Sequence, residues 1–271
     1  MNQDKSVKCL WLTIAFSCFL CLVAVAARPA HAEPEALTIA AAADLNFAFK
    51  DLIKDFEAHT GERVRFIGGS SGHFYTQIIN GAPFDLYFSA DIAYPKKLIA
   101  EGFALPESLY HYALGRIVLW VPNGSTLDVS KGMEACVDSA VKKLAIANPK
   151  HAPYGKAAVA ALEHYKLTDR MTDKLVFGEN IAQTAQFVQA GAANMGIIAL
   201  SIAVAPTMEQ LGKHWLIPAD AHPPIEQGAV IVKATKHPEK ANKFLEFMRT
   251  EQARAVMKRY GFTLPEEKIQ R

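Results

Sequence analysis

The fold of this chain is decided by residues 63–85, which read RVRFIGGSSGHFYTQIINGAPFD. An alternating apolar run at the start of this stretch predicts a strand. Gly68-Gly69-Ser70-Ser71-Gly72 then turns the chain, and Phe74, Ile78 and Ile79 mark the apolar face of a short helix. The stretch therefore predicts a strand, a turn rich in glycine and serine, and a helix, in that order.

The serines of this turn have two interpretations. A serine directly before a helix usually caps it, because its hydroxyl accepts a hydrogen bond from a backbone N–H group one turn on. The same helix N-terminus, with its unpaired N–H groups and the positive end of the helix dipole, can also bind an anion. The glycines would let a ligand approach the backbone closely. We expect a ligand at this turn, with simple capping by Ser70 or Ser71 as the alternative.

The first 32 residues have the pattern of a cleaved secretion signal. Two lysines precede an apolar run over residues 9–26, and Ala30-His31-Ala32 fits a small-x-small cleavage site. A membrane anchor is the alternative, but the run is at the short end for a full span and ends in the cleavage motif. We expect export to the periplasm and a mature chain that begins at Glu33.

The composition of the mature chain argues against some classes of partner. Removing 32 of 271 residues leaves 239, and it removes three of 29 basic and one of 27 acidic residues, so that 26 of each remain. A formally neutral protein has no electrostatic reason to bind nucleic acid or anionic lipid. Of the four cysteines only Cys136 lies outside the signal, so we expect no internal disulfide. The chain is long enough to bury a core in one large domain or two small ones.

Strands and helices are expected to alternate along the mature chain. The predicted strands cover residues 37–40, 64–67, 85–89, 115–122, 143–147, 175–177, 193–200 and 225–232. The predicted helices cover residues 45–56, 74–79, 93–101, 157–165, 181–188, 238–248 and 250–260. This alternation is typical of a mostly parallel sheet with helices on both faces. We therefore expect an α/β fold.

Four strand-to-helix turns are the candidate ligand positions. Two lie in the first half, at Ala43-Asp44 and Ser70-Ser71, and two in the second, at Pro153-Tyr154 and Glu179-Asn180. Ligands of open parallel sheets bind at the carboxyl ends of the strands, next to helix N-termini. Two lobes that face each other would therefore point four helix N-termini into one cleft.

Five segments carry the pattern of a known family, in order along nearly the whole mature chain. They are AAAADL (40–45), GSSGHFYTQIINGAPFDLYFSAD (69–91), ANPKHAPYGKAA (147–158), GENIAQTAQFVQAGAANMGII (178–198) and FLEFMRTEQARAVMKRYGF (244–262). On these segments the chain resembles the periplasmic molybdate-binding proteins of ABC transporters. The second segment is fairly specific for that family, and the combination is much more so.

The resemblance implies two α/β lobes joined by a two-stranded hinge, as in class II periplasmic binding proteins. Lobe I would comprise residues 36–117 and 226–271 and lobe II residues 118–225, with 117–121 and 225–232 as the crossing strands. It also implies a monomer that captures a tetrahedral oxyanion, molybdate or tungstate, and delivers it to the permease of an ABC importer. Neither an enzymatic activity, nor a cofactor, nor a bare metal ion is expected.

The ligand contacts of the family, carried over position by position, fall on Asp44, Ser71, Tyr154, Ile181 and Ala199. The resemblance implies that three backbone N–H groups bind the anion at helix starts, and that Ser71 adds its hydroxyl. None of these residues is basic. Fixed neutral dipoles can balance a dianion without a counter-charge, so selection between molybdate and sulfate would rest on cavity size.

Two of these positions depart from the family. Asp44 stands where many members have a hydroxyl residue, and a carboxylate beside a dianion is repulsive. We expect its carboxylate to cap its own helix and point away from the ligand, while its N–H group faces the ligand. Ala199 stands where many members have a tyrosine, and the phenol of Tyr154 could offset that loss. Which oxyanion is preferred stays open.

An exported serine hydrolase is one alternative function. The turn fits G-x-S-x-G with Ser70 as the nucleophile, and Asp220 and His222 follow later in the chain. That fold places several strands before its nucleophile, however, whereas only one precedes this strand and turn. Asp220 and His222 are also too close in sequence to be separately delivered members of a triad.

A periplasmic metal-ion carrier is the other alternative. The histidines of the mature chain are scattered, without an i, i+4 pair or a cysteine partner, and we expect most of them at the surface. Iron carriers need clustered phenolates or carboxylates, for which Tyr110 and Tyr112 are weak candidates.

Overall fold

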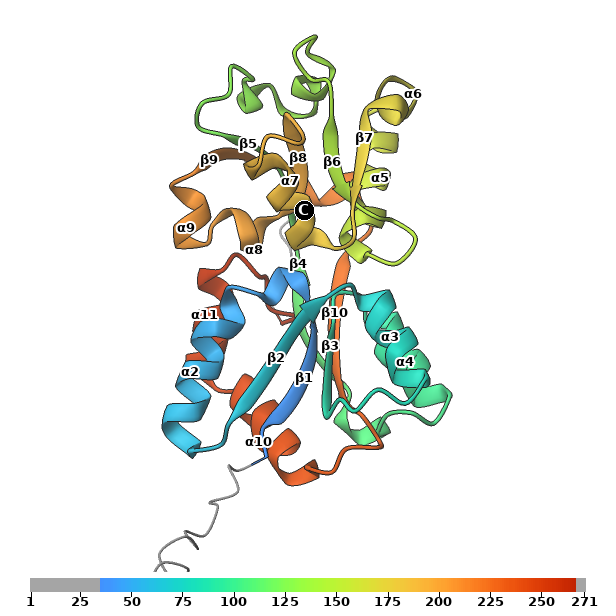
Figure 1. The fold of residues 1–271 in the computed structure, drawn as a ribbon, viewed down its shortest axis with the longest axis vertical. Helices are drawn as coiled ribbons and strands as arrows, with labels where there is room; N and C mark the ends of the chain where they lie inside the picture. The colour runs from blue at the N-terminus through green and yellow to red at the C-terminus, as the bar shows by residue number, and fades with distance from the viewer. Residues whose placement is uncertain (1–34, 267–271) are drawn as a thin grey trace, which may run out of the picture. The chain divides into compact units, whose positions relative to one another are not determined.

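Two five-stranded sheets form the framework of the chain (Figure 1). The computed structural model describes residues 35–266, so the predicted secretion signal lies outside the described residues. The described residues from Ala36 onward belong to one compact unit. We call the first sheet with its helices lobe I and the second sheet with its helices lobe II.

Lobe I is built from both ends of this unit. Its strands are β1 (Leu37–Ala42), β2 (Val64–Gly69), β3 (Leu86–Ser89), β4 (Tyr110–Gly115) and β10 (Ile225–Ile231). Its helices are η1 (Ala43–Leu45), α2 (Ala48–Thr60), α3 (Ser71–Ile79), α4 (Ala93–Ala100), η2 (Pro106–Ser108), α10 (Pro238–Met248) and α11 (Glu251–Arg259). The strand order is β2-β1-β3-β10-β4.

Lobe II is one continuous part of the chain. Its strands are β5 (Ile117–Pro122), β6 (Leu144–Ala147), β7 (Leu175–Gly178), β8 (Met195–Ala199) and β9 (Gly212–Leu216). Its helices are η3 (Val129–Val137), α5 (Pro153–His164), α6 (Thr168–Met171), η4 (Thr172–Lys174), α7 (Ile181–Gln189), α8 (Leu200–Ala203), α9 (Pro206–Glu209) and η5 (Ala219–Ala221). The strand order is β7-β6-β8-β5-β9.

In each sheet one strand runs against the other four. β1 pairs in parallel with β2 and β3, whereas β10 lies antiparallel between β3 and β4. In lobe II, β6 pairs in parallel with β7 and β8, and β5 lies antiparallel between β8 and β9. The prediction of an α/β fold with mostly parallel sheets is confirmed.

The passages between the lobes differ from the predicted ones. We expected residues 117–121 and 225–232 to cross between the lobes. Instead β5 pairs with β8 and β9 in lobe II, and β10 pairs with β3 and β4 in lobe I. The passages are the single residue Arg116, between β4 and β5, and the segment with η5 that precedes β10. The lobe boundaries and a hinge movement about these passages remain predictions.

Apolar side chains on both faces of the first sheet require helices on both faces. Phe49, Phe56, Phe88 and Phe244 form one buried aromatic cluster under α2 and α10, with ring centroids 5.0–5.9 Å apart. α3 and α4 cover the opposite face, where a second core cluster contains Tyr87. Burying one large apolar side chain contributes about 1.5–3 kcal/mol, so these two layers hold the sheet in place.

Helix ends follow local signals that are visible in the sequence. α2 ends at Gly61, whose φ of 71° is the left-handed conformation that glycine adopts without strain. α11 begins after Thr250, whose hydroxyl accepts a hydrogen bond from the N–H group of Ala253 at 3.2 Å. A glycine directly after a helix and a threonine directly before one are the residue types that sequence patterns assign to these two positions.

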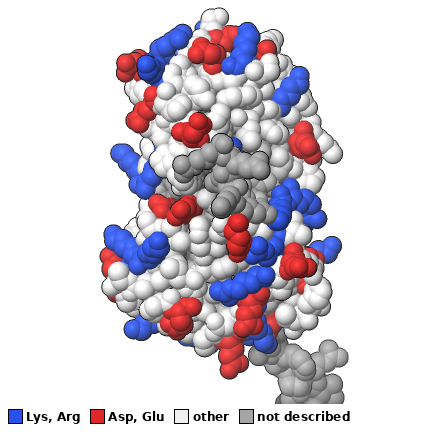
Figure 2. All heavy atoms as spheres, turned by 180° about the vertical axis from the view of Figure 1, so that it is seen from behind, with Lys and Arg blue, Asp and Glu red and all other residues white. Residues whose placement is uncertain are grey.

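The surface carries charges of both signs (Figure 2), and the one cysteine of the described residues is buried. Figure 2 shows lysines and arginines interspersed with acidic residues on one face. Cys136 is free and buried, and burial raises the pKa of its thiol to about 12. Because the thiolate is the reactive form, this thiol is inert at neutral pH.

Among residues 35–266, no helix is both long and apolar enough to cross a membrane.

Candidate functional site

The four predicted turns meet around one small cavity between the lobes. Its lining includes Asp44 and Ser71 from lobe I and Tyr154 and Ile181 from lobe II, which are the four predicted ligand-binding residues. Ala199 is buried at the end of β8 and does not line the cavity. The cavity volume is about 10 Å³, which is roughly the room needed by one water molecule.

Part of the hydrogen-bonding capacity of the helix N-termini is used within the protein. The first four N–H groups of a helix have no acceptor inside the helix. At α3, the N–H group of Gly72 donates to the carbonyl of His151 in lobe II at 2.9 Å. At α7, the side chain of Asn180 accepts from the second and third N–H groups of the helix at 3.0 Å.

The remaining N–H groups at these turns are available to a ligand. Within residues 35–266, the structure records no acceptor for the N–H groups of Ser71, Tyr154 and Ile181. Each of them belongs to the first turn of a helix whose dipole has its positive end at the cavity. Three backbone donors with no counter-cation among the cavity-lining side chains are suited to an anion.

Ser71 adds a hydroxyl donor at the same place. Its side chain is 1% exposed, and its Oγ accepts a hydrogen bond from the N–H group of Ala90 at 3.0 Å. The phenol of Tyr87 donates to the Ser71 carbonyl at 2.8 Å and fixes the turn. Because Oγ already accepts from the protein, its own proton is left to be donated to a ligand.

The expectation that Asp44 caps its own helix is wrong, whereas the orientation of its N–H group toward a ligand stays a prediction. The N-cap position of η1 is Ala42, and no side chain caps this short helix. The carboxylate of Asp44 is fully buried and its Oδ2 accepts from the phenol of Tyr154 at 2.9 Å and from Nε2 of Gln227 at 2.8 Å. The Tyr154 phenol therefore contacts the carboxylate across the cavity instead of replacing the tyrosine missing at Ala199.

Burial changes the ionisation of Asp44. It raises the pKa of the carboxyl from 3.8 to about 6, and this effect exceeds the lowering by the hydrogen bonds from Gln227 and Tyr154. The second carboxyl oxygen, Oδ1, is buried and has no hydrogen-bond partner in the described chain. A carboxyl with this pKa is mostly protonated only below about pH 6, and its repulsion of an anion is then lost.

The residues that hold Asp44 were not predicted from the sequence. Gln227 also lies 2.9 Å from the Tyr154 oxygen and accepts from the phenol of Tyr112 at 2.7 Å. Ser201 of lobe II donates to the carbonyl of Asp44 at 2.8 Å. A single amide side chain inside the apolar strand IEQGAVI was a signal for a buried polar network, because a buried amide needs partners.

Ser70 neither caps its helix nor forms the predicted triad. Its hydroxyl donates to the carbonyl of His151 at 2.7 Å, and its Oγ lies 3.0 Å from Nδ1 of the same residue. His222, the predicted triad base, contacts the carbonyl of Pro223 at 2.8 Å instead. A Cβ on Gly72 would lie 2.8 Å from the His151 carbonyl, so the turn glycine serves contact between lobes.

Two histidines that look scattered in the sequence lie together. The rings of His73 and His151 stack with their centroids 3.9 Å apart, and both approach the carboxylate of Glu179. His73 comes from lobe I and the other two from lobe II. Each lies within two residues of a predicted ligand turn, which is the only signal that the sequence contained.

Two larger hollows also lie between the lobes, with volumes of about 220 and 400 Å³. The first is lined by the ion pair of Asp91 and Lys156, 3.7 Å apart. The second is lined by residues such as Phe47, Phe66 and Met208. Neither collects the helix N-termini and buried donors that converge on the small cavity, so the small cavity is the candidate site.

Known proteins share both the sequence and the fold. The profile described as "Bacterial extracellular solute-binding protein" matches residues 37–263. Molybdate-binding proteins of Rhodobacter capsulatus and Azotobacter vinelandii are 36% and 38% identical over 243 residues, which is 90% of this chain and 93% and 94% of theirs. The predicted resemblance is thereby confirmed.

Solved structures give the same result. The periplasmic molybdate-binding protein of Azotobacter vinelandii aligns with a TM-score of 0.80 at 35% identity, over 85% of this chain and 100% of its own. The sulfate-binding protein SubI of Mycobacterium tuberculosis shares the fold, with a TM-score of 0.69 at 16% identity over 85% of this chain and 87% of its own. The fold is that of the class II periplasmic binding proteins. The chain belongs to the family of bacterial extracellular solute-binding proteins.

Proposed function

We propose that this protein binds a tetrahedral oxyanion, molybdate or tungstate, in the small cavity between the lobes and delivers it to the permease of an ABC importer. One observation carries the proposal: turns from both lobes place the N-termini of α3, α5 and α7 at one cavity whose lining includes no lysine, arginine or histidine. A dianion held there is balanced by fixed dipoles and by the hydroxyl of Ser71.

The relatives support molybdate among the possible oxyanions. The proteins of Rhodobacter capsulatus and Azotobacter vinelandii are named as molybdate-binding, and they align along almost their whole length. Asp44 is compatible with an anion when its carboxyl is protonated, and its raised pKa of about 6 lets a bound dianion favour that form. The cavity holds about one water molecule here, so its lining has to rearrange locally to admit an anion with four oxygens.

The setting of this function follows from the same arguments. We infer that the protein acts in the periplasm as a monomer, after cleavage of the secretion signal behind Ala32. It needs no cofactor and transforms no substrate. Ser70 supports this, because its hydroxyl proton is already donated to a carbonyl and its histidine contact spans two lobes.

A thermal-shift panel tests the proposal. Molybdate, tungstate, sulfate, phosphate and chromate are each added to the protein, and the melting temperature is recorded. A ligand at 100 times its dissociation constant stabilises the folded state by about 2.7 kcal/mol, which gives a clear shift. We expect the largest shifts with molybdate and tungstate. A protein that melts at the same temperature with all five anions does not have this function.

A further inference from the structure

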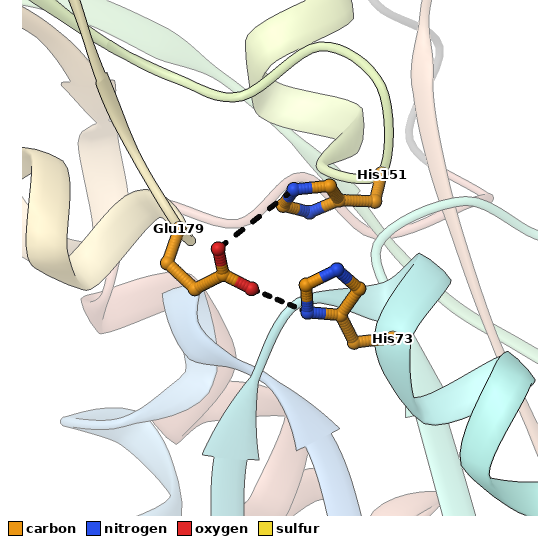
Figure 3. Close-up of side chains that lie close together, drawn as sticks. All are labelled: His73, His151 and Glu179. Atoms are coloured by element: carbon orange, nitrogen blue, oxygen red, sulfur yellow. Dashed lines mark ion pairs between the residues drawn. The ribbon is translucent and has the colours of Figure 1, made fainter.

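Three potential metal ligands from both lobes converge at the rim of the cleft (Figure 3). His73 lies in the first turn of α3, His151 in the loop between β6 and α5, and Glu179 in the turn between β7 and α7. One ligand atom from each lies within 4.8 Å of the other two. Among residues 35–266 this is the only group of three or more such side chains.

Both rings present a nitrogen to the same carboxylate. Nδ1 of His73 contacts one oxygen of Glu179, and Nε2 of His151 lies 3.9 Å from the other, as the dashed lines in Figure 3 show. Two imidazole nitrogens and a carboxylate oxygen form a ligand set that Zn²⁺ and related first-row divalent ions prefer. A water molecule would complete a four-coordinate ion.

The tautomer of His151 leaves the correct nitrogen free. Ser70 donates its only hydroxyl proton to the His151 carbonyl at 2.7 Å, so its Oγ can only accept from Nδ1–H of His151 at 3.0 Å. The lone pair of Nε2 then faces Glu179 at 3.9 Å, which is too long for a hydrogen bond. A histidine that binds a metal through one ring nitrogen commonly donates the N–H group of its other ring nitrogen to a partner in this way.

The cluster is also accessible from solvent. The side chains of His73 and Glu179 are 45% and 49% exposed, which leaves the cluster open to ions from solvent. An ion pair of such exposure is worth little by itself, because water screens it.

We propose that His73, His151 and Glu179 bind a divalent first-row metal ion such as Zn²⁺ and that this ion holds the two lobes together. The site lies outside the oxyanion cavity, whose lining contains none of the three residues. Because one ligand belongs to lobe I and two to lobe II, metal binding favours the conformation in which the lobes touch. The metal acts as a latch on the cleft and is not the transported solute.

Zinc titration in the absence of any oxyanion tests the site directly. The protein, prepared without a polyhistidine tag, competes with a chromophoric chelator for Zn²⁺. We expect one ion per chain, and at least about tenfold weaker binding in His73→Gln, Glu179→Gln and Ser70→Ala, because even an outer partner of a ligating histidine contributes that much. His164→Gln, an exposed histidine on α5, should bind like wild type.

The site would be overturned if the protein bound no stoichiometric Zn²⁺, or if His73→Gln bound Zn²⁺ as tightly as wild type. It would also be overturned if wild type bound Mg²⁺, which prefers oxygen ligands, as tightly as Zn²⁺. Small-angle scattering tests the latch. Zn²⁺ alone should lower the radius of gyration of wild type and leave that of His73→Gln unchanged. Bound Zn²⁺ without compaction would exclude the latch. These outcomes do not depend on whether the protein binds molybdate.

Discussion

Asp44 carries the only acidic side chain among the described residues that line the cavity, so its charge dominates the electrostatics of the site. It was predicted as a ligand position, and it lines the cavity. Its carboxylate accepts hydrogen bonds from Tyr154 and Gln227 and does not cap a helix. The sequence placed the residue at the cavity because its turn is a local feature. It could not place the side chain, because Gln227 lies 183 positions away and Tyr154 belongs to the other lobe.

The first prediction concerns oxyanion affinity and pH. A dianion favours the protonated form of Asp44, whose pKa is about 6 in the folded protein. Molybdate should therefore bind more tightly as the pH falls from 8 to 6, by up to about tenfold per pH unit if one proton is taken up. Asp44→Asn should bind more tightly than wild type at pH 8 and show no such slope. Calorimetric titration at both pH values measures this, and a wild-type affinity independent of pH would place the carboxyl away from the anion.

The second prediction concerns the stability of the protein without ligand. The pKa of Asp44 is raised in the folded state, from 3.8 to about 6, so folding is favoured by the proton. This stabilisation is complete below about pH 4 and is lost as the pH rises through 6, with a total of about 3 kcal/mol. The difference in unfolding free energy between Asp44→Asn and wild type should therefore shift by about 3 kcal/mol in favour of the variant as the pH rises from 4 to 8. Urea denaturation at several pH values measures it, and a constant difference would contradict the assignment.

At the scale of elements, the starts of the helices could be predicted from the sequence more fully than the edge strands β4 and β9. The turns at residues 70–71, 153–154 and 179–180 were predicted from glycine, proline and serine next to apolar periodicity, and three helices begin there. β4 and β9 were missed as separate strands. Both lie at sheet edges and pair with strands far away in sequence, so no local pattern requires them.

The third prediction tests how closely α5 must approach β6. A Cβ on Gly155 would lie 2.1 Å from the carbonyl oxygen of Ala147, so Gly155→Ala has to push the start of α5 away from the strand. We expect a loss of about 1–3 kcal/mol in unfolding free energy and weaker oxyanion binding, because the N–H group of Tyr154 moves with the helix. Chemical denaturation and calorimetry measure the two effects.

Gly124→Ala is the matched control for that variant. A Cβ at Gly124 meets no atom within 4 Å, so this substitution should leave both the stability and the affinity close to wild type. If Gly155→Ala were as stable as Gly124→Ala and bound the anion equally well, the close approach of helix and strand would not matter for the site.

At the scale of the whole molecule, the site exists only while the lobes touch. Ser70 reaches His151, Asp44 reaches Tyr154, and Ser201 reaches the carbonyl of Asp44, each across the boundary. The fold class and the four ligand turns could be predicted because they arise from local patterns and family resemblance. These contacts could not, because they depend on how the two sheets are oriented relative to each other.

The fourth prediction follows from this dependence. Small-angle scattering of the protein should show a smaller radius of gyration with saturating molybdate than without it, because the ligand bridges donors from both lobes. Zn²⁺ must be removed with a chelator beforehand, so that only the oxyanion closes the cleft. Identical scattering curves at a molybdate concentration that saturates a parallel titration would mean that the lobes do not move.

The central claim is that the anion sits between the helix N-termini and takes a hydrogen bond from Ser71. Calorimetric titration of molybdate into wild type, Ser71→Ala and the exposed-site control Ser130→Ala tests it most directly. A hydrogen bond to a charged group contributes about 1.5–3 kcal/mol, so Ser71→Ala should bind roughly ten- to a hundredfold more weakly, and Ser130→Ala like wild type. Binding of molybdate by Ser71→Ala as tight as that by wild type would contradict the account.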